Sequence, residues 1–213
     1  MIKLSRAILC ISVFSLGLIS TANANLEARA GGMVYDTDLN ITWLSDANYA
    51  QTSGYDADGR MNWNEANTWA ESLNVGGVSG WRLPTADWCL GLSCPKSEMG
   101  HLFYNELGGT EFNSILSSSD PDLALFTNIQ QVYLFDEYWS GTTDYIHMDY
   151  QNAVAFAFRF FDGFPDEAYK SYNFSAWAVH DGDVAAIPEP ETYAMMVLGL
   201  AVLFGFGRLR EQS

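Results

Sequence analysis

Basic residues are scarce in this sequence. The chain of 213 residues holds 10 Lys and Arg against 26 Asp and Glu. Between residues 25 and 187 there are 6 basic and 23 acidic side chains, a net charge of −17. Binding to phosphates or anionic lipid requires basic groups that neutralise them, so we expect no nucleic-acid partner. The same span is rich in Trp, Tyr and Phe, which predicts a folded domain with an aromatic core instead of a disordered acidic tail.

Cysteine is also nearly absent, with three residues in the whole chain. Cys10 lies in an N-terminal apolar run, which leaves Cys89 and Cys94 for the rest of the protein. In an oxidising compartment such a pair favours a disulfide that closes a short loop. A reactive pair or half of a metal site is the alternative. No His–Cys cluster completes a zinc set, because the histidines are dispersed along the sequence, at His101, His147 and His180.

Signatures of catalysis are missing as well. The sequence has no internal repeat, no glycine-rich phosphate loop and no nucleophile elbow around Ser140. Its acids are too numerous to single out a pair for glycoside hydrolysis. We therefore expect no catalytic residues and a protein that is not an enzyme.

The N-terminus has the order of features of a secretory signal peptide. Lys3 and Arg6 form a basic start, and residues 7–20 form a short apolar run. Ala22 and Ala24 then give the small-x-small pattern that signal peptidase accepts. We expect export, with residues 1–24 removed by cleavage after Ala24.

The C-terminus carries a second three-part signal. Pro188, Glu189 and Pro190 come first, residues 194–207 are apolar, and the basic side chains that follow are Arg208 and Arg210. A helix of 14 residues is about 21 Å long, short against a hydrocarbon core of about 30 Å, and the arginines favour a cytoplasmic end. Residues 188–213 resemble a PEP-CTERM sorting domain. The resemblance implies recognition by exosortase, a membrane-embedded transpeptidase. It also implies transient anchoring in the inner membrane by a C-terminal apolar helix, cleavage near the motif, and delivery to the cell surface or extracellular matrix.

Residues 25–187 remain for one domain. Apolar runs at 32–35 and 41–44 predict an opening hairpin. Asn62 with Glu65 predicts a capping box at the start of one helix, and Ser97 predicts the N-cap of a second helix that ends before Gly108. Later runs predict strands, the middle one with phenylalanines on one face and alanines on the other, over residues 138–142, 152–161 and 176–180. Hairpin, two helices and an antiparallel, loop-rich sheet indicate an α+β fold.

The tryptophan-containing motifs of this domain carry a second resemblance. They are Val34-Tyr35-Asp36, Thr42-Trp43-Leu44, Gly80-Trp81-Arg82-Leu83-Pro84-Thr85, Tyr138-Trp139-Ser140-Gly141-Thr142 and Trp177-Ala178-Val179. Over residues 32–183 the chain resembles the Lcl C-terminal domain family. The resemblance implies a fold like those of C-type lectins and formylglycine-generating enzymes, and adhesion to surfaces or polysaccharide. We therefore expect a non-catalytic domain that binds glycan or a protein partner. An extracytoplasmic enzyme related to the latter, using Cys89 and Cys94, is the alternative.

Two acidic clusters are candidate Ca²⁺ ligands, although we expect no required cofactor. Asp36, Asp38 and Asn40 alternate along one segment, and Asp56 and Asp58 precede a glycine. Residues Ile41 and Ala47 stand where an EF-hand loop needs Gly and Glu. Asx residues also form turns without metal, which is the favoured interpretation.

Sugar rings stack on exposed aromatic faces, which makes tyrosines in polar segments the candidate ligand residues for an extracellular polysaccharide. They are Tyr49, Tyr55, Tyr145, Tyr150 and Tyr172. Ordinary surface packing is the alternative for each tyrosine. The tryptophans at periodic or motif positions are expected in the core, namely Trp63, Trp69, Trp81, Trp139 and Trp177.

Overall fold

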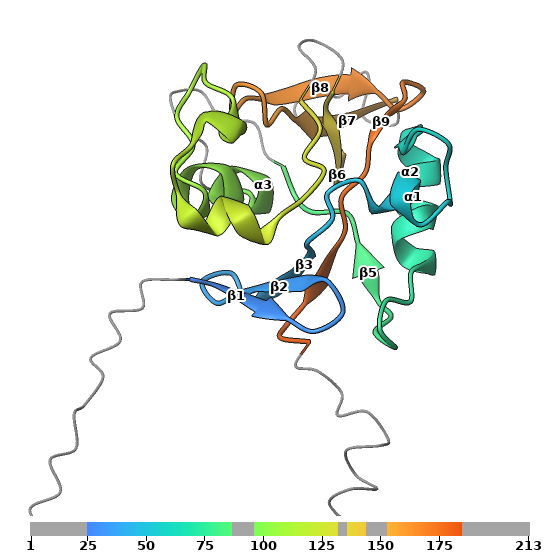
Figure 1. Ribbon diagram of the computed structural model, residues 1–213. Helices are drawn as coiled ribbons and strands as arrows, with labels where there is room; N and C mark the ends of the chain where they lie inside the picture. The colour runs from blue at the N-terminus through green and yellow to red at the C-terminus, as the bar shows by residue number, and fades with distance from the viewer. Residues whose placement is uncertain (1–24, 87–95, 132–135, 144–152, 185–213) are drawn as a thin grey trace, which may run out of the picture.

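A computed structural model describes residues 25–86, 96–131, 136–143 and 153–184 (Figure 1). Within these ranges the strands form two five-stranded sheets, and the helices are short. Figure 1 shows the sheets at opposite ends of the domain, with α3 on one side and α1 and α2 on the other. This sheet-rich arrangement agrees with the expected α+β class.

The first sheet has the order β1-β2-β3-β10-β5. The predicted hairpin is present as β2 (Met33–Asp36) and β3 (Ile41–Leu44), and β1 (Leu26–Arg29) extends it by a strand that the sequence did not reveal. Near the end of the domain, β10 (Val179–Asp181) inserts between β3 and β5 (Trp81–Arg82). The middle of this sheet therefore depends on pairing between strands that are far apart in the sequence.

The second sheet has the order β4-β9-β6-β7-β8. Its central strands are β6 (Tyr138–Thr143) and β7 (Val154–Phe158), which pair antiparallel. The sequence predicted a strand that continues to residue 161, but β7 ends at Phe158, so the prediction was wrong in its extent. Both faces of β7 are buried. The outer strands are β8 (Pro165–Tyr169), β9 (Phe174–Ser175) and β4 (Arg60–Met61).

The longest helix of the described residues is α2 (Trp63–Ser72), and it begins as the sequence predicts. Asn62 accepts a hydrogen bond from the backbone of Glu65, and the Glu65 side chain accepts one in return from the Asn62 backbone. This capping box satisfies two amides that the first helical turn leaves without partners.

The second predicted helix has a less regular form. Ser97 caps α3 (Glu98–His101), and the chain continues as a π-helical turn, η1 (Leu102–Glu106). The other helical elements are α1 (Tyr49–Thr52) and the 3₁₀ turns η2 (Ile115–Ser117) and η3 (Pro121–Leu125). Tyr49, one of the candidate ligand tyrosines, therefore lies at the start of a short helix.

The core is built from aromatic side chains, as the composition predicts. Trp43 and Trp177 meet edge to face with ring centroids 5.2 Å apart. Two of the buried indoles donate across the domain: Trp139 to the Met61 carbonyl at 2.8 Å and Trp177 to the Leu44 carbonyl at 2.7 Å. Of the five tryptophans expected in the core, four are fully buried and Trp63 is partly buried. These side chains join both sheets into one core.

Several predictions fall outside the described residues. They are the signal peptide with Ala22 and Ala24, the sorting motif Pro188-Glu189-Pro190 with the tail to residue 213, the pair Cys89 and Cys94, and the tyrosines Tyr145 and Tyr150. In the ranges that are described, we find no helix with both the length and the apolar character needed to cross a bilayer.

Candidate functional site

The first predicted Ca²⁺ cluster forms a turn between β2 and β3. Asp36 Oδ1 accepts hydrogen bonds from the backbone of Asp38 at 3.0 Å and Leu39 at 2.9 Å. Asn40 adopts a positive φ of 54° and accepts a hydrogen bond from the Tyr35 hydroxyl. These bonds are those of an Asx turn, which explains the spacing of the three residues without a calcium ion.

The second cluster is arranged in the same way. Asp56 Oδ1 accepts from the backbone of Asp58 at 3.0 Å and Gly59 at 2.8 Å, and Asp58 accepts from the backbone of Arg60 at 3.0 Å. Gly59 has a φ of 77°, and a Cβ there would overlap the Asn48 side chain. The glycine is thus needed for the turn itself.

The predicted ligand tyrosines differ in their surroundings. Tyr49 packs against the core, whereas Tyr55 and Tyr172 have exposed fractions of 53% and 51%. Of these three, Tyr172 lines one of the two cavities described below, and the other two tyrosines line neither. Tyr172 thus differs from the other two tyrosines because it lies beside a cavity that is large enough for a ligand.

The cavity at Tyr172 has a volume of about 510 Å³ and lies among β4, β8, β9 and the residue before β6. Its lining combines charged, amide and apolar side chains: Arg60, Glu137, Asp166, Glu167, Ala168, Tyr172, Asn173 and Phe174. Small-molecule sites commonly have this size and this mixture of an apolar surface with a few polar groups. We call it the Tyr172 cavity.

An aromatic wall forms one side of the Tyr172 cavity. The Tyr172 amide bonds to the Tyr169 carbonyl at 2.8 Å, a turn that leads from β8 towards β9. The Tyr172 ring meets Tyr169 at 5.8 Å and Phe174 at 6.3 Å between centroids, both edge to face. Phe174 is buried, so it anchors the exposed rings to the core. Tyr172 therefore presents its ring from a supported position.

Ion pairs hold the basic side chains in and near the cavity. Arg60, which lines it, bonds to the buried carboxylate of Asp136 at 2.7 Å and to the Asn173 carbonyl at 3.2 Å. Arg159 contacts Asp166, another lining residue, at 2.5 Å. Because both guanidinium groups already face carboxylates, they offer little net positive charge to an anionic ligand.

Glu137, one of the acids that line the Tyr172 cavity, has a raised pKa. Burial, with the neighbouring charge of Asp166, raises the pKa of Glu137 from an ordinary value near 4.5 to about 7. Arg159, whose Nη1 lies 3.8 Å from Glu137 Oε1, opposes this shift. Near neutral pH the carboxyl group therefore exists in both forms and can donate or accept a hydrogen bond.

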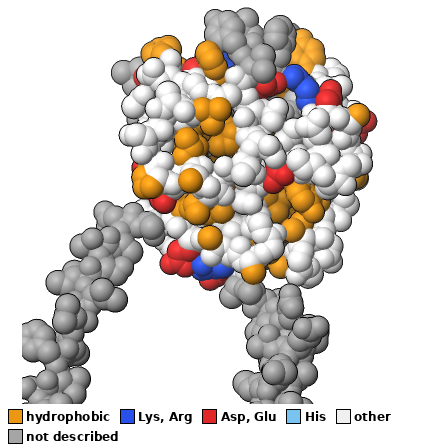
Figure 2. Space-filling model, viewed as in Figure 1, with side chains coloured by type: hydrophobic (Ala, Val, Ile, Leu, Met, Phe, Trp, Pro, Cys, Tyr) orange, Lys and Arg blue, Asp and Glu red, His pale blue; other side chains and the backbone are white. Residues whose placement is uncertain are grey.

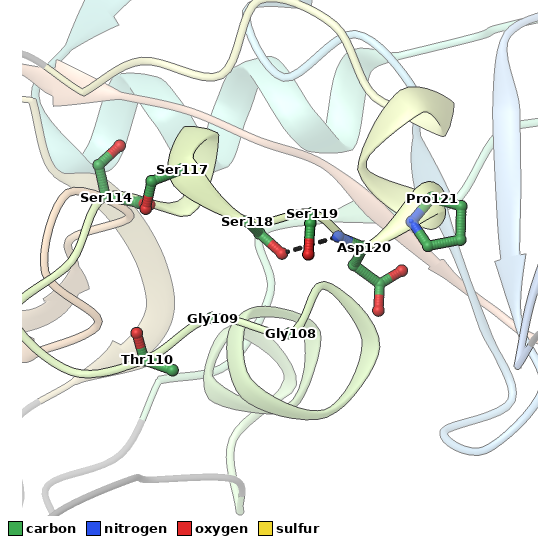
Figure 3. A pocket seen from close by; sticks show the side chains of 9 residues that line it. All are labelled: Gly108, Gly109, Thr110, Ser114, Ser117, Ser118, Ser119, Asp120 and Pro121. Atoms are coloured by element: carbon green, nitrogen blue, oxygen red, sulfur yellow. Dashed lines mark hydrogen bonds between the residues drawn. The ribbon is translucent and has the colours of Figure 1, made fainter.

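A second cavity, of about 430 Å³, is lined by hydroxyl groups (Figure 3). Ser118 donates to the Leu107 carbonyl at 2.6 Å and accepts from the Asp120 amide at 3.1 Å. Asp120 in turn caps η3 by accepting from Asp122 at 2.9 Å. No aromatic side chain lines this cavity, and its polar groups serve the local turns. It is the weaker candidate for sugar binding.

Comparison with known proteins identifies the domain. The family model of the Lcl C-terminal domain matches residues 32–180. The chain belongs to the Lcl C-terminal domain family. No curated protein and no solved structure matches it. In this Lcl C-terminal domain, the Trp81-Arg82 motif forms β5, and both Tyr172 and Asn173 lie within the matched span.

Tyr172 was a candidate from the sequence, whereas the polar residues that line the cavity with it were not. Arg60, Glu137 and Asp166 come from three separate strands or their flanks, and no short motif links them. Asn173 could have been proposed because it follows the tyrosine directly. The remaining partners depend on strand pairing, which their sequence spacing does not encode.

Proposed function

We propose that this chain is an exported protein of the cell surface or extracellular matrix, sorted by exosortase, whose Lcl C-terminal domain binds glycan without catalysis. Support for export and sorting comes from the terminal segments at 1–24 and 188–213. Support for a binding role comes from the Tyr172 cavity. The lectin-like character of the fold is part of the same proposal.

One observation carries the binding role: the half-exposed Tyr172 ring stands beside a cavity lined by carboxyl and amide groups. A pyranose has an apolar face of C–H groups and a rim of hydroxyls. The aromatic ring offers a stacking surface to the former, while Asn173 and the carboxyl groups can accept hydrogen bonds from the latter. Tyr169 and Phe174 hold the ring in place, so little side-chain entropy is lost on binding.

The charge of the cavity indicates the class of sugar. Three acidic side chains line it, and its one basic side chain, Arg60, is paired with Asp136. An acidic or sulfated polysaccharide would meet like charge, also from the domain as a whole, whose net charge is strongly negative. Neutral sugars or amino sugars are therefore the expected ligands. The face in Figure 2 shows apolar side chains in separate patches, with small groups of acidic and basic side chains between them.

The test uses neutral, amino-sugar and uronic-acid oligosaccharides prepared from extracellular polysaccharide. Tyr172→Ala is expected to weaken binding of a neutral or amino sugar roughly tenfold. Tyr55→Ala is the matched control, because Tyr55 is equally exposed but does not line the cavity. Equal effects of the two substitutions, or preferred binding of uronic acids, would count against the proposal.

Sorting is tested by intact mass and cell fractionation in a polysaccharide-producing host. We expect loss of residues 1–24 in either case, and release from the inner membrane only when exosortase is present. A tail retained in the presence of exosortase would instead indicate a membrane-anchored periplasmic domain.

A further inference from the structure

Three buried side chains meet between the first sheet and α3. Asp36 ends β2, His101 ends α3, and Glu106 ends the π-helical turn η1. One ligand atom from each lies within 4.8 Å of the other two, and the exposed fractions are 0%, 7% and 4% in that order. Figure 1 shows α3 above the β1–β2 hairpin. The cluster therefore joins two parts of the domain that are distant in sequence.

The π-helical turn is what brings His101 and Glu106 together. The Leu107 amide bonds to the Leu102 carbonyl at 3.0 Å, a bond between residues five apart. In an α-helix, residues five apart point in different directions, whereas a π turn stacks them on one side. His101 Nε2 consequently lies 2.8 Å from Glu106 Oε1. Such turns occur frequently at functional sites.

Asp36 has an oxygen that the turn does not use. Its Oδ1 accepts the two backbone hydrogen bonds of the Asx turn. Its Oδ2 is buried and has no hydrogen-bond donor among the described residues. A buried carboxylate oxygen without a donor destabilises the folded domain, because it has lost its bonds to water without gaining others.

The charges of the cluster do not balance. Burial raises the pKa of Asp36, and burial together with the Asp36 charge raises the pKa of Glu106. His101 Nδ1 lies 3.1 Å from the Asn105 amide nitrogen, which can only donate. With the Asn105 amide in this orientation, Nδ1 accepts its hydrogen bond and Nε2–H donates to Glu106. Two buried carboxyl groups therefore share a single histidine, which can balance at most one negative charge.

We propose that Asp36, His101 and Glu106 bind one divalent transition-metal ion, with Zn²⁺ as the best fit. A histidine nitrogen with two carboxylate oxygens is a ligand set typical of zinc, whereas Ca²⁺ and Mg²⁺ take oxygen ligands only. A charge of +2 neutralises two carboxylates, and the free Asp36 Oδ2 gains a partner. This site is distinct from the predicted calcium cluster, since it shares with it only Asp36.

Binding requires small local changes. Ligands at about 2.0–2.1 Å from a tetrahedral ion lie about 3.3 Å apart, so His101 and Glu106 must separate slightly from their hydrogen-bonded distance. The imidazole proton moves from Nε2 to Nδ1, which frees the Nε2 lone pair for the ion. A half-turn of the Asn105 amide then presents its oxygen to Nδ1–H, the kind of outer hydrogen bond that orients metal-bound histidines.

The test is a titration of the purified full-length chain with Zn²⁺ after removal of metal by a chelator. We expect one ion per chain by elemental analysis, and a melting temperature that rises with Zn²⁺ concentration. Asp36→Asn, His101→Gln and Glu106→Gln should each weaken binding by tenfold or more. Asp38→Asn is the control, because Asp38 lies in the same turn but is exposed and contributes no ligand to the cluster.

X-ray absorption of the bound ion in the unaltered chain gives a readout that does not depend on the folding of variants. Nitrogen and oxygen ligands including one imidazole are expected. Sulfur ligands would place the ion at Cys89 and Cys94 and overturn the proposal. So would the absence of a bound ion, or binding by Asp36→Asn equal to that of the unaltered chain. None of these results bears on sugar binding at Tyr172, since the two sites have no residue in common.

Discussion

Arg82 and Glu98 form a two-pronged ion pair, with Nη1–Oε2 at 2.8 Å and Nη2–Oε1 at 2.7 Å. Arg82 belongs to β5 and Glu98 begins α3, so the pair joins the Trp-Arg-Leu-Pro motif to the second helix. Asp181 of β10 binds the same guanidinium at 2.5 Å. The arginine of the motif is thus a junction between three elements, and its role is structural.

Arg82→Lys should destabilise the domain by about 1–2 kcal/mol. An ammonium group cannot reproduce the paired donors that the planar guanidinium offers to Glu98. Urea unfolding followed by tryptophan fluorescence measures the change. Asp181→Asn is the control and should change stability by less than about 0.5 kcal/mol, because the Asp181 side chain is 76% exposed. An Arg82→Lys variant with the same free energy of unfolding as the unaltered chain would show that the paired geometry contributes nothing to stability.

Glu137→Gln should make the domain more stable at alkaline pH. The folded-state pKa of about 7 exceeds the ordinary value near 4.5, so the folded domain resists ionisation of this group. The contribution of Glu137 to stability is therefore complete below about pH 4.5 and is lost as the pH rises through 7. At pH 8 the variant should exceed the unaltered chain by up to about 3 kcal/mol.

The control for Glu137→Gln is the same comparison at pH 4, where Glu137 is protonated in both folded and unfolded states. There the two chains should unfold at similar urea concentrations. A stability difference that does not change between pH 4 and pH 8 would contradict the raised pKa and point to a packing effect of the amide.

Removing the cap of α2 tests the local signal that the sequence showed most clearly. Asn62→Ala should cost about 1 kcal/mol, because the Glu65 amide loses its acceptor at the start of the helix. Asn64 is exposed and is the second residue of the same helix, so Asn64→Ala should change the free energy of unfolding by less than about 0.5 kcal/mol. Thermal unfolding monitored by circular dichroism distinguishes the two.

Signals that act over a few residues were predictable from this sequence. The Asn62 and Glu65 capping box, the Ser97 cap and the hairpin that ends at Leu44 all depend on neighbours within one or two turns of chain. Buried tryptophans were predictable for a different reason. Burying a large aromatic side chain lowers the free energy of the folded state, so a tryptophan at a periodic or motif position is usually found in the core.

What remained hidden depends on distant pairing or on irregular backbone. The partnership of β10 with β3 and β5 places His180 opposite both Thr42 and Trp81, and nothing in the sequence encodes these registers. The cluster of Asp36, His101 and Glu106 was missed for two reasons. Asp36 is remote in sequence, and a separation of five residues is not the spacing of an α-helical face, so the histidine was interpreted as isolated.

The pair Cys89 and Cys94 provides the last prediction. The segments that flank it are held together, since Thr85 and Glu98 exchange hydrogen bonds of 2.7 and 3.1 Å. We expect the exported protein to contain a Cys89–Cys94 disulfide, so that an alkylating reagent labels these cysteines only after reduction and unfolding. Site-specific mass mapping separates them from Cys10, which leaves with the signal peptide.

Replacing both Cys89 and Cys94 with serine should lower stability by about 2 kcal/mol, the chain-entropy contribution of a loop this short. Sugar binding at the Tyr172 cavity should persist in this double variant, because the described residues that line the cavity belong to other segments of the chain. Rapid labelling of either cysteine in the folded, unreduced protein would contradict the disulfide. It would instead favour the alternative of a reactive pair and an enzymatic role, since a free thiolate is the form that acts as a nucleophile.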